Sequence, residues 1–269
     1  MNAFDDRGLR LGAGEIHVCS TRDQHIGDEA LLALYRSWLS AEETERMARF
    51  RFERHRHQYL ITRALLRSTL SRYAPWVAPQ QWRFANNAWG KPAIVAPAVP
   101  MAFNLSHTEG LVVLALTLEN SVGIDVESSQ RPVDPDLAER FFSAAEVRYL
   151  ASLSATDQTS AFLTLWTLKE AYIKACGQGL SIPLESFCFD LATPGQIGFS
   201  CQALALFQAR RWRFWQWESG PFVLSLGCCP PSQHLPAMAV RVYEVIPGLS
   251  HEPREAVMCR TSADCSALC

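Results

Sequence analysis

The chain has 269 residues, of which 48% are hydrophobic and 19% are charged, and its formal net charge at pH 7 is −2. Such a composition is typical of a globular protein that can bury one large core or two smaller ones. A net charge this small provides no overall field for binding nucleic acid or an anionic membrane. No apolar run approaches the roughly 20 residues that a membrane helix needs. We therefore expect neither a membrane nor a nucleic-acid partner.

The N-terminus and the cysteines indicate the compartment. Residues 1–10 contain acidic residues and no hydrophobic core segment, so we do not expect a secretory signal there. The nine cysteines are odd in number and include no Cys-x-x-Cys pair. Most lie among apolar residues, as Cys19 and Cys188 do, which favours buried, reduced thiols over a disulfide framework. We expect a cytoplasmic protein.

The first part of the chain predicts an α/β unit after a flexible, Gly-rich segment at residues 1–14. Ser40 and Glu43 form a capping box that begins a helix, and Pro75 ends a long helix. The other signals predict, in chain order, a strand at 15–20, helices at 28–39 and 54–73, a strand at 82–84 and a turn at 86–92.

Three apolar runs in the middle of the chain predict strands. The segment 101–107 leads into the run 111–116, and a polar break precedes the run 122–127. We interpret the last two runs as a hairpin whose turn is centred on residues 118–121. In such a hairpin the end that holds Glu127 lies close to His107.

The second part of the chain repeats the order of the first. Ser143 and Glu146 form another capping box, and a helix is predicted over 159–176, with Gly177 and Pro183 as its end signals. The following segments predict strands at 187–191, 198–206, 212–217, 222–226 and 239–245. Residues 247–269 form a polar, Ser- and Cys-bearing tail that we expect to be disordered.

These signals predict an α/β (α+β) fold of two similar halves in one chain. The halves span 15–121 and 122–246. Each would have a small, mainly antiparallel sheet and a long helix, and the two would pack about a pseudo-two-fold axis. We expect the functional site at the seam between them.

Two carboxylates alternate along one predicted strand. In the run Val122-Gly123-Ile124-Asp125-Val126-Glu127 the apolar residues share one face, and Asp125 and Glu127 share the other. Their backbones are roughly 7 Å apart at about 3.3 Å of rise per residue. Mg²⁺ is one cation that would relieve their repulsion, because it prefers oxygen ligands. The simpler alternative is a strand whose polar face meets water.

A third carboxylate lies on the long helix of the second half. Helical spacing puts Trp166, Glu170 and Lys174 on one face. Glu170 could join the two strand acids as a ligand or serve as a base beside them. The alternative is an ordinary surface pair between Glu170 and Lys174, which stabilises a helix by a few tenths of a kcal/mol.

Basic residues are concentrated in the first half. Eight arginines lie between residues 46 and 72, with only Glu53 as an acid among them: Arg46, Arg49, Arg51, Arg54, Arg56, Arg63, Arg67 and Arg72. Guanidinium groups bind phosphate in a bidentate manner, so this run is a candidate anion-binding surface. The alternative is a solvated helix face with structural ion pairs.

Shorter signals add further candidates. Gly90 and Lys91 lie in a predicted turn, and Ser106 and His107 end a predicted strand. No G-x-S-x-G elbow surrounds the serine, so phosphate contact suits this pair better than nucleophilic catalysis. A structural histidine remains the alternative for His107.

The order of these motifs resembles the 4′-phosphopantetheinyl transferases. Three segments match the family signatures: Phe103-Asn104-Leu105-Ser106-His107, Gly123-Ile124-Asp125-Val126-Glu127 and Trp166-x-x-Lys169-Glu170-Ala171-x-x-Lys174. Three more match the larger, pseudodimeric, surfactin-synthetase-type branch: Gly90-Lys91-Pro92, Phe141-Phe142-Ser143 and Gly177-x-Gly179-Leu180. The resemblance covers roughly residues 15–245. It implies a monomeric enzyme with coenzyme A as co-substrate, Mg²⁺ as cofactor and an apo acyl or peptidyl carrier protein as acceptor.

The resemblance also implies roles for individual residues. Asp125, Glu127 and Glu170 match the metal-binding acids, and Glu170 is also the expected general base. The remaining matches concern coenzyme A. Ser106 and His107 match the loop that holds its phosphates, Lys91 and Lys174 match cations at its nucleotide and pyrophosphate, and Gly90 belongs to the same turn as Lys91. His107 and Lys174 would also assist catalysis.

The arginines of the helical region correspond to the adenosine end of coenzyme A. Arg46, Arg56 and Arg63 fall in the segment that meets the 3′-phosphate and adenine, although no motif fixes which of them do. Two other classes remain open. A non-catalytic coenzyme A or nucleotide binder would need fewer than three acids. A nucleic-acid-binding module would need more aromatic residues interleaved with the basic run and a more basic chain.

Overall fold

The computed structural model describes residues 9–118, 121–134, 136–204, 206–230 and 238–262. The described residues of the first half form three α-helices and five strands: β1 (Glu15–Thr21), α1 (Glu29–Trp38), α2 (Ala41–Ala48), α3 (Glu53–Tyr73), β2 (Arg83–Asn86), β3 (Pro92–Ala96), β4 (Met101–Thr108) and β5 (Leu111–Leu118). Ser40 caps α2 as predicted, because its side chain accepts from the amide of Glu43 while the Glu43 carboxylate accepts from the amide of Ser40.

The second half repeats this order. It contains β6 (Ser121–Ser128), α4 (Asp136–Phe141), α5 (Ala144–Ala151), α6 (Ala155–Cys176), β7 (Phe187–Asp190), β8 (Gly198–Cys201), α7 (Leu206–Ala209), β9 (Arg213–Ser219) and β10 (Phe222–Cys229). Ser143 and Glu146 form the second predicted capping box, at the start of α5. The long helices α3 and α6 therefore follow equivalent caps in the two halves.

The strands form two main sheets whose orders correspond. The first sheet has the order β12-β11-β1-β5-β4 and the second has the order β13-β9-β10-β6. In each half the opening strand pairs antiparallel with the second strand of a later hairpin: β1 with β5, and β6 with β10. The short pairs β2–β3 and β7–β8 lie outside the main sheets. The predicted fold of two similar α/β halves is confirmed.

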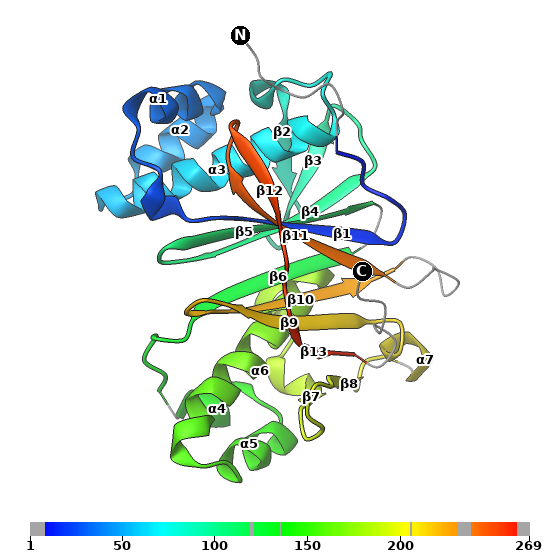
Figure 1. The fold of residues 1–269 in the computed structure, drawn as a ribbon. Helices are drawn as coiled ribbons and strands as arrows, with labels where there is room; N and C mark the ends of the chain where they lie inside the picture. Colours follow the sequence, from blue (N-terminus) through cyan, green and yellow to red (C-terminus); the bar gives the residue numbers. More distant parts are fainter. Residues whose placement is uncertain (1–8, 119–120, 135, 205, 231–237, 263–269) are drawn as a thin grey trace.

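The two sheets stack between the two groups of helices (Figure 1). One buried cluster packs α3 against the first sheet, and another packs α6 against the second. A third cluster lies between the sheets and includes Ile16, Val18, Ile124 and Trp215. The apolar face of β6 thus points to the inter-sheet core, and its polar face points to α6. None of the described helices combines the length and the apolar character that a membrane-spanning helix requires.

The predicted hairpin of residues 111–116 and 122–127 is wrong. β5 pairs on one side with β1 and on the other with β4, whereas β6 pairs with β10. Because both edges of β5 are already occupied, the chain crosses to the second sheet after β5. The spatial expectation still holds, because β4 and β6 lie together where the two sheets meet, and Ser106 on β4 bonds to Asp125 on β6.

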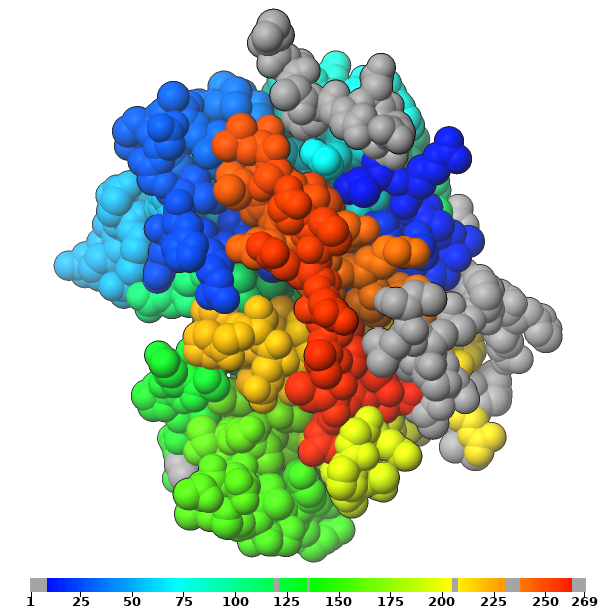
Figure 2. Space-filling model, viewed as in Figure 1, coloured from blue at the N-terminus to red at the C-terminus, as the bar shows by residue number. Residues whose placement is uncertain are grey.

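The C-terminal segment also differs from expectation. Residues 250–261, expected to be part of a disordered tail, include β12 (Ser250–Arg254) and β13 (Met258–Thr261). β11 (Ala239–Ile246), expected in the second half, instead pairs parallel with β1 of the first sheet. β12 extends the first sheet and β13 extends the second. Figure 2 shows this segment running over the surface from one half to the other.

The contact between α6 and the second sheet depends on glycine. Gly123 on β6 and Gly227 on β10 are paired in register. A Cβ atom at Gly123 would overlap with the backbone oxygen of Ala171 and the backbone nitrogen of Ala175. The helix can therefore lie directly on the sheet at this point, which brings the side chains of the next helical turns close to Asp125.

We predict that Gly123→Ala destabilises the protein by about 3 kcal/mol, at the upper part of the usual range for overpacking, because the backbone of α6 would have to move. The denaturant midpoint should fall with an unchanged slope. Gly27→Ala is the matched control, since nothing lies within 4 Å of the added methyl group. Equal midpoints for the two variants would contradict the close helix contact.

Candidate active site

A hydrogen bond from β6 to the side chain of Asn104 on β4 joins the two halves at their seam. Within the part of the chain that the structure describes, β6 pairs through one of its edges, with β10. On its other side, the side chain of Asn104 on β4 accepts a hydrogen bond from the buried amide of Ile124, at 2.8 Å. A buried amide without such a partner is costly. Asn104 thus sets the position of β6 relative to β4.

Three polar side chains from three elements meet at this seam. The Ser106 hydroxyl of β4 donates to Oδ1 of Asp125 at 2.8 Å. The Lys174 ammonium of α6 donates to the same oxygen at 2.5 Å and to the Ser106 hydroxyl at 2.9 Å. Asp125 is only 5% exposed, so its charge depends on these partners. The structure thus brings Ser106, Asp125 and Lys174 together at one point.

The other two predicted acids lie near this cluster and interact with it electrostatically. Burial raises the pKa of Glu170, and the negative charge of Asp125 raises it further, while Lys174 opposes the shift. Burial also raises the pKa of Glu127, again with a contribution from Asp125. Glu127 pairs with Arg131. The pKa of each of these two carboxyl groups is thus higher than that of an ordinary glutamate.

The three acids do not converge as a ready set of metal ligands. Among the described residues, no three His, Cys, Asp or Glu side chains lie close enough together to hold a metal ion. Like-charged carboxylates repel, and two of the three acids pair with a cation of their own: Asp125 with Lys174 and Glu127 with Arg131. However, Oδ2 of Asp125 is buried and has no hydrogen-bond partner. A hard cation would satisfy this oxygen, so Asp125 fits a magnesium ligand.

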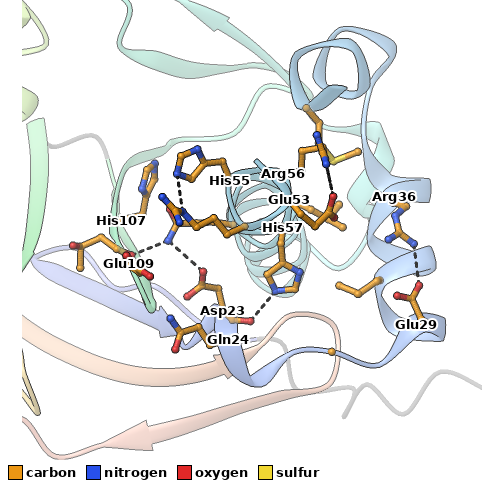
Figure 3. Close-up of a pocket in the computed structure, with 17 residues that line it drawn as sticks. Asp23, Gln24, Glu29, Arg36, Glu53, His55, Arg56, His57, His107 and Glu109 are labelled. Atoms are coloured by element: carbon orange, nitrogen blue, oxygen red, sulfur yellow. Dashed lines mark hydrogen bonds and ion pairs between the residues drawn. The ribbon is translucent and has the colours of Figure 1, made fainter. Parts of the chain in front are cut away.

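A cavity of about 730 Å³ lies in the first half, and arginine, histidine and carboxylate side chains all line it (Figure 3). His107, which follows Ser106 on β4, lines its wall together with Arg56 from α3. Desolvation of the imidazole lowers the pKa of His107, and the positive charge of Lys174 lowers it further. His107 thus connects the cavity with the Ser106–Asp125–Lys174 cluster.

The three predicted arginines have different surroundings. Arg56 lines the cavity, where it bonds to Glu53 and to the carbonyl oxygen of Phe50. Arg46 lines a separate surface hollow and lies over the ring of Tyr59, at 5.9 Å. Arg63 forms an ion pair with Glu43 and is largely buried. The structure therefore does not bring these arginines together, because the periodicity of α3 points Arg63 toward α2 and not into the cavity.

The turn between β2 and β3 also lies apart from the cavity. Gly90 adopts a positive φ of 90° there, which favours glycine. The Lys91 ammonium donates to the carbonyl oxygens of Val122, at 3.1 Å, and Ala175, at 3.0 Å. Lys91 and Gly90 are thus separated from the cavity wall, and their predicted contact with a nucleotide has no support in this geometry.

Several cavity residues were not among the predicted site residues. Arg36, Arg54, His55 and His57 supply further basic groups, and Asp23, Glu29, Glu53 and Glu109 supply acids. The Asp23 backbone oxygen pairs with the His57 ring at 2.9 Å. Arg54, His55 and His57 stand in the basic run of the sequence, but Arg36 and Asp23 come from earlier segments. Only tertiary packing brings the latter two to the cavity.

The motif residue Lys169 has a structural environment. Its ammonium is fully buried and donates to the Glu146 carboxylate, at 2.9 Å, and to the carbonyl oxygens of Leu184 and Phe187. Glu146 in turn accepts from the amide of Phe189. This charge pair fixes α6 to α5 and to β7, so Lys169 supports the helix that carries Glu170 and Lys174.

Comparison with known proteins gives a consistent result along the chain. The family model of the 4′-phosphopantetheinyl transferase superfamily matches residues 121–227, and the N-terminal model of 4′-phosphopantetheinyl transferase matches residues 28–119. The transferase Sfp of Bacillus subtilis (strain 168) is 37% identical over 164 residues, which cover 61% of this chain and 71% of that protein. The chain belongs to the 4′-phosphopantetheinyl transferases and is an enzyme of the Sfp type.

Two further similarities are weaker. A phosphopantetheinyl transferase of Thraustochytrium sp. is 32% identical over 176 residues, covering 61% of each chain. The solved structure of Thermotoga maritima holo-[acyl-carrier-protein] synthase has a TM-score of 0.36 and 24% identity to this chain. That match covers 42% of this chain and 64% of the solved one, so it extends over only part of each fold.

We predict that Lys169→Met lowers the free energy of unfolding by roughly 3–5 kcal/mol, because it leaves the Glu146 carboxylate buried without its cation. Arg254→Met is the matched control. Arg254 pairs with Glu244 at 2.8 Å, but both side chains are about half exposed. Its loss should cost less than about 1 kcal/mol. Chemical denaturation of both variants measures the difference, and a small effect for Lys169→Met would contradict its structural role.

Proposed function

We propose that this enzyme transfers the 4′-phosphopantetheine arm of coenzyme A to a serine of an apo acyl or peptidyl carrier protein. The carrier serine attacks the β-phosphorus of coenzyme A. The bond between this phosphorus and the bridging diphosphate oxygen breaks, and adenosine 3′,5′-bisphosphate leaves. The observation that carries the proposal is the Ser106–Asp125–Lys174 cluster, which lies at the seam, where the next residue of β4, His107, lines a cavity that also holds Arg56.

Coenzyme A would bind with its diphosphate at the seam. Lys174 and Ser106 are donors there, and His107 stands between them and the cavity. The adenosine end would enter the cavity, where Arg56 and its basic neighbours suit a 3′-phosphate. Arg46 and Arg63 are less suited to this role, because Arg46 lies in another hollow and Arg63 is paired with Glu43.

A magnesium ion would be held by Asp125, with Glu127 and Glu170 as further ligands. The unpartnered Oδ2 of Asp125 supports this assignment. When bound, the metal would neutralise charge that develops on the diphosphate. Lys174 contributes to the same charge balance from α6, since its ammonium already touches Asp125 at 2.5 Å. Phosphoryl transfer depends mainly on such positioning and charge neutralisation.

Glu170 is the proposed general base. It would accept the proton of the carrier serine as the new phosphoester bond forms. Its raised pKa, caused by burial and by Asp125, suits a carboxylate that must take up a proton near neutral pH. Lys174 and His107 would stabilise the negative charge on the leaving group.

The architecture favours a monomer as the active form, because both walls of the seam come from one chain. A cytoplasmic location is also part of the proposal, since none of the seven described cysteines forms a disulfide. The alternative function is a non-catalytic coenzyme A or nucleotide binder. The cavity alone would serve such a binder, whereas the acids at the seam favour catalysis.

The direct test is to mix the protein, Mg²⁺ and coenzyme A with a panel of apo acyl and peptidyl carriers. We expect at least one carrier to gain the mass of one phosphopantetheine arm, and EDTA to prevent the gain. Coenzyme A binding without a mass gain on any carrier would support the non-catalytic alternative.

We predict that Glu170→Gln reduces the transfer rate by roughly 10²- to 10⁴-fold, because the amide cannot take the serine proton. Coenzyme A binding, measured by calorimetry, should remain within about twofold of the unmodified protein. Glu45→Gln is a control on an exposed surface. An unchanged rate for Glu170→Gln would remove Glu170 as the base.

We predict that Arg56→Met weakens coenzyme A binding by roughly 1.5–3 kcal/mol, the usual value of a hydrogen bond to a charged group. The loss should disappear with 3′-dephospho-coenzyme A. Arg46→Met is the matched control, because Arg46 lines a separate hollow. Equal losses for the two variants would contradict the assignment of the cavity to the 3′-phosphate.

A further inference from the structure

The C-terminal end of α6 is held by a turn from the other half of the protein. The turn comprises residues 87–91 and connects β2 with β3. The last carbonyl groups of any helix lack partners within the helix. In α6 the amide of Gly177 caps the carbonyl oxygen of Ile173. The carbonyl oxygens of Ala175 and Gly177 are bonded instead by Lys91 and Asn87.

The turn is built to present these two donors. The Asn87 side-chain oxygen accepts from the amides of Trp89 and Lys91, both at 2.9 Å. This leaves the Asn87 amide nitrogen free to donate to Gly177 at 2.7 Å. Asn87 thus closes its own turn with one atom and contacts α6 with the other.

Lys91 joins two elements of the second half. Its ammonium donates to Ala175 at the end of α6 and to Val122 at the start of β6. Its aliphatic chain packs against Gly177, where a Cβ atom would lie 2.8 Å from Cδ of Lys91. Burial lowers the pKa of Lys91 to about 8. A cation in this place also complements the negative end of the helix dipole.

The two elements that Lys91 joins are the ones that carry the proposed reaction. β6 carries Asp125. α6 carries Glu170 and Lys174, and Lys174 directly precedes Ala175, whose carbonyl oxygen Lys91 binds. None of the described residues that line the 730 Å³ cavity comes from the turn 87–91. A shift of α6 along β6 would therefore alter the contact of Lys174 with Asp125 without changing the cavity wall.

We propose that Asn87 and Lys91 are positioning residues, which clamp the end of α6 to β6 so that Glu170 and Lys174 face Asp125. Lys91 acts in this way through backbone carbonyl groups and not as a phosphate ligand. The kinetic consequence rests on the proposed transfer reaction. The structural consequence, protection of the last turn of α6, does not.

The test uses the full chain with Lys91→Met, Asn87→Ala and the double variant. Hydrogen exchange at the amides of residues 173–177 should rise about tenfold in each single variant, as expected when a side-chain hydrogen bond to the helix end is lost. In the double variant these amides should exchange only slightly faster than in the single variants, since Asn87 and Lys91 both hold the last turn of α6. Arg83→Met, which removes a charge from β2 of the same hairpin, should leave this exchange unchanged.

Binding and kinetics distinguish positioning from ligand contact. We expect kcat to fall about tenfold in both single variants, while the KM and calorimetric affinity for coenzyme A stay within about twofold. The inference is overturned if Lys91→Met weakens coenzyme A binding tenfold while Asn87→Ala is silent, or if neither variant changes the exchange. If the unmodified protein transfers nothing to any carrier, the proposed function fails, but the exchange result still decides the clamp.

Discussion

The buried carboxylate of Asp125 is the group on which the seam depends. A charge with 5% exposure requires partners, and these come from both halves: Ser106 from the first sheet and Lys174 from α6. Removing either partner would leave the charge undercompensated in a poorly solvated position. The contacts that link the two halves therefore bring a hydroxyl, an ammonium and a carboxylate to one point. The buried charge of Asp125 thus requires the same polar groups that the proposed reaction would use.

This arrangement requires α6 to lie very close to β6, which glycine makes possible. Gly123 is two residues before Asp125, and its missing side chain lets the backbone of Ala171 approach the sheet. On the helix, Glu170 precedes this contact and Lys174 follows it. The fully buried pair of Lys169 and Glu146 holds the far face of the helix. Within one motif, Lys169 thus fixes the helix, whereas Glu170 and Lys174 lie near Asp125.

The features that could be predicted from the sequence are those set by local periodicity. The capping boxes at Ser40 and Ser143 depend on neighbouring residues only, and so does the alternation that puts Asp125 and Glu127 on one face. Strand pairing depends on distant segments. The pairing of β1 with β11 joins residues more than 200 positions apart, and no local signal marks it. The polar break after β5 suggested a hairpin, although it leads the chain into another sheet.

The basic residues show the same limit at the level of single side chains. The sequence shows how many arginines α3 carries, but the role of each arginine depends on the side chains that it contacts in the fold. Glu43 on α2 takes Arg63 and Arg67 into a buried network, whereas Arg56 remains at the cavity. The chain contains only three lysines. Lys91 bonds to the end of α6, whereas Lys169 and Lys174 belong to α6 and pair with Glu146 and Asp125. A compact ammonium with three donors suits such backbone and carboxylate contacts better than a planar guanidinium, which explains why arginine prevails on the open surface but not around this helix.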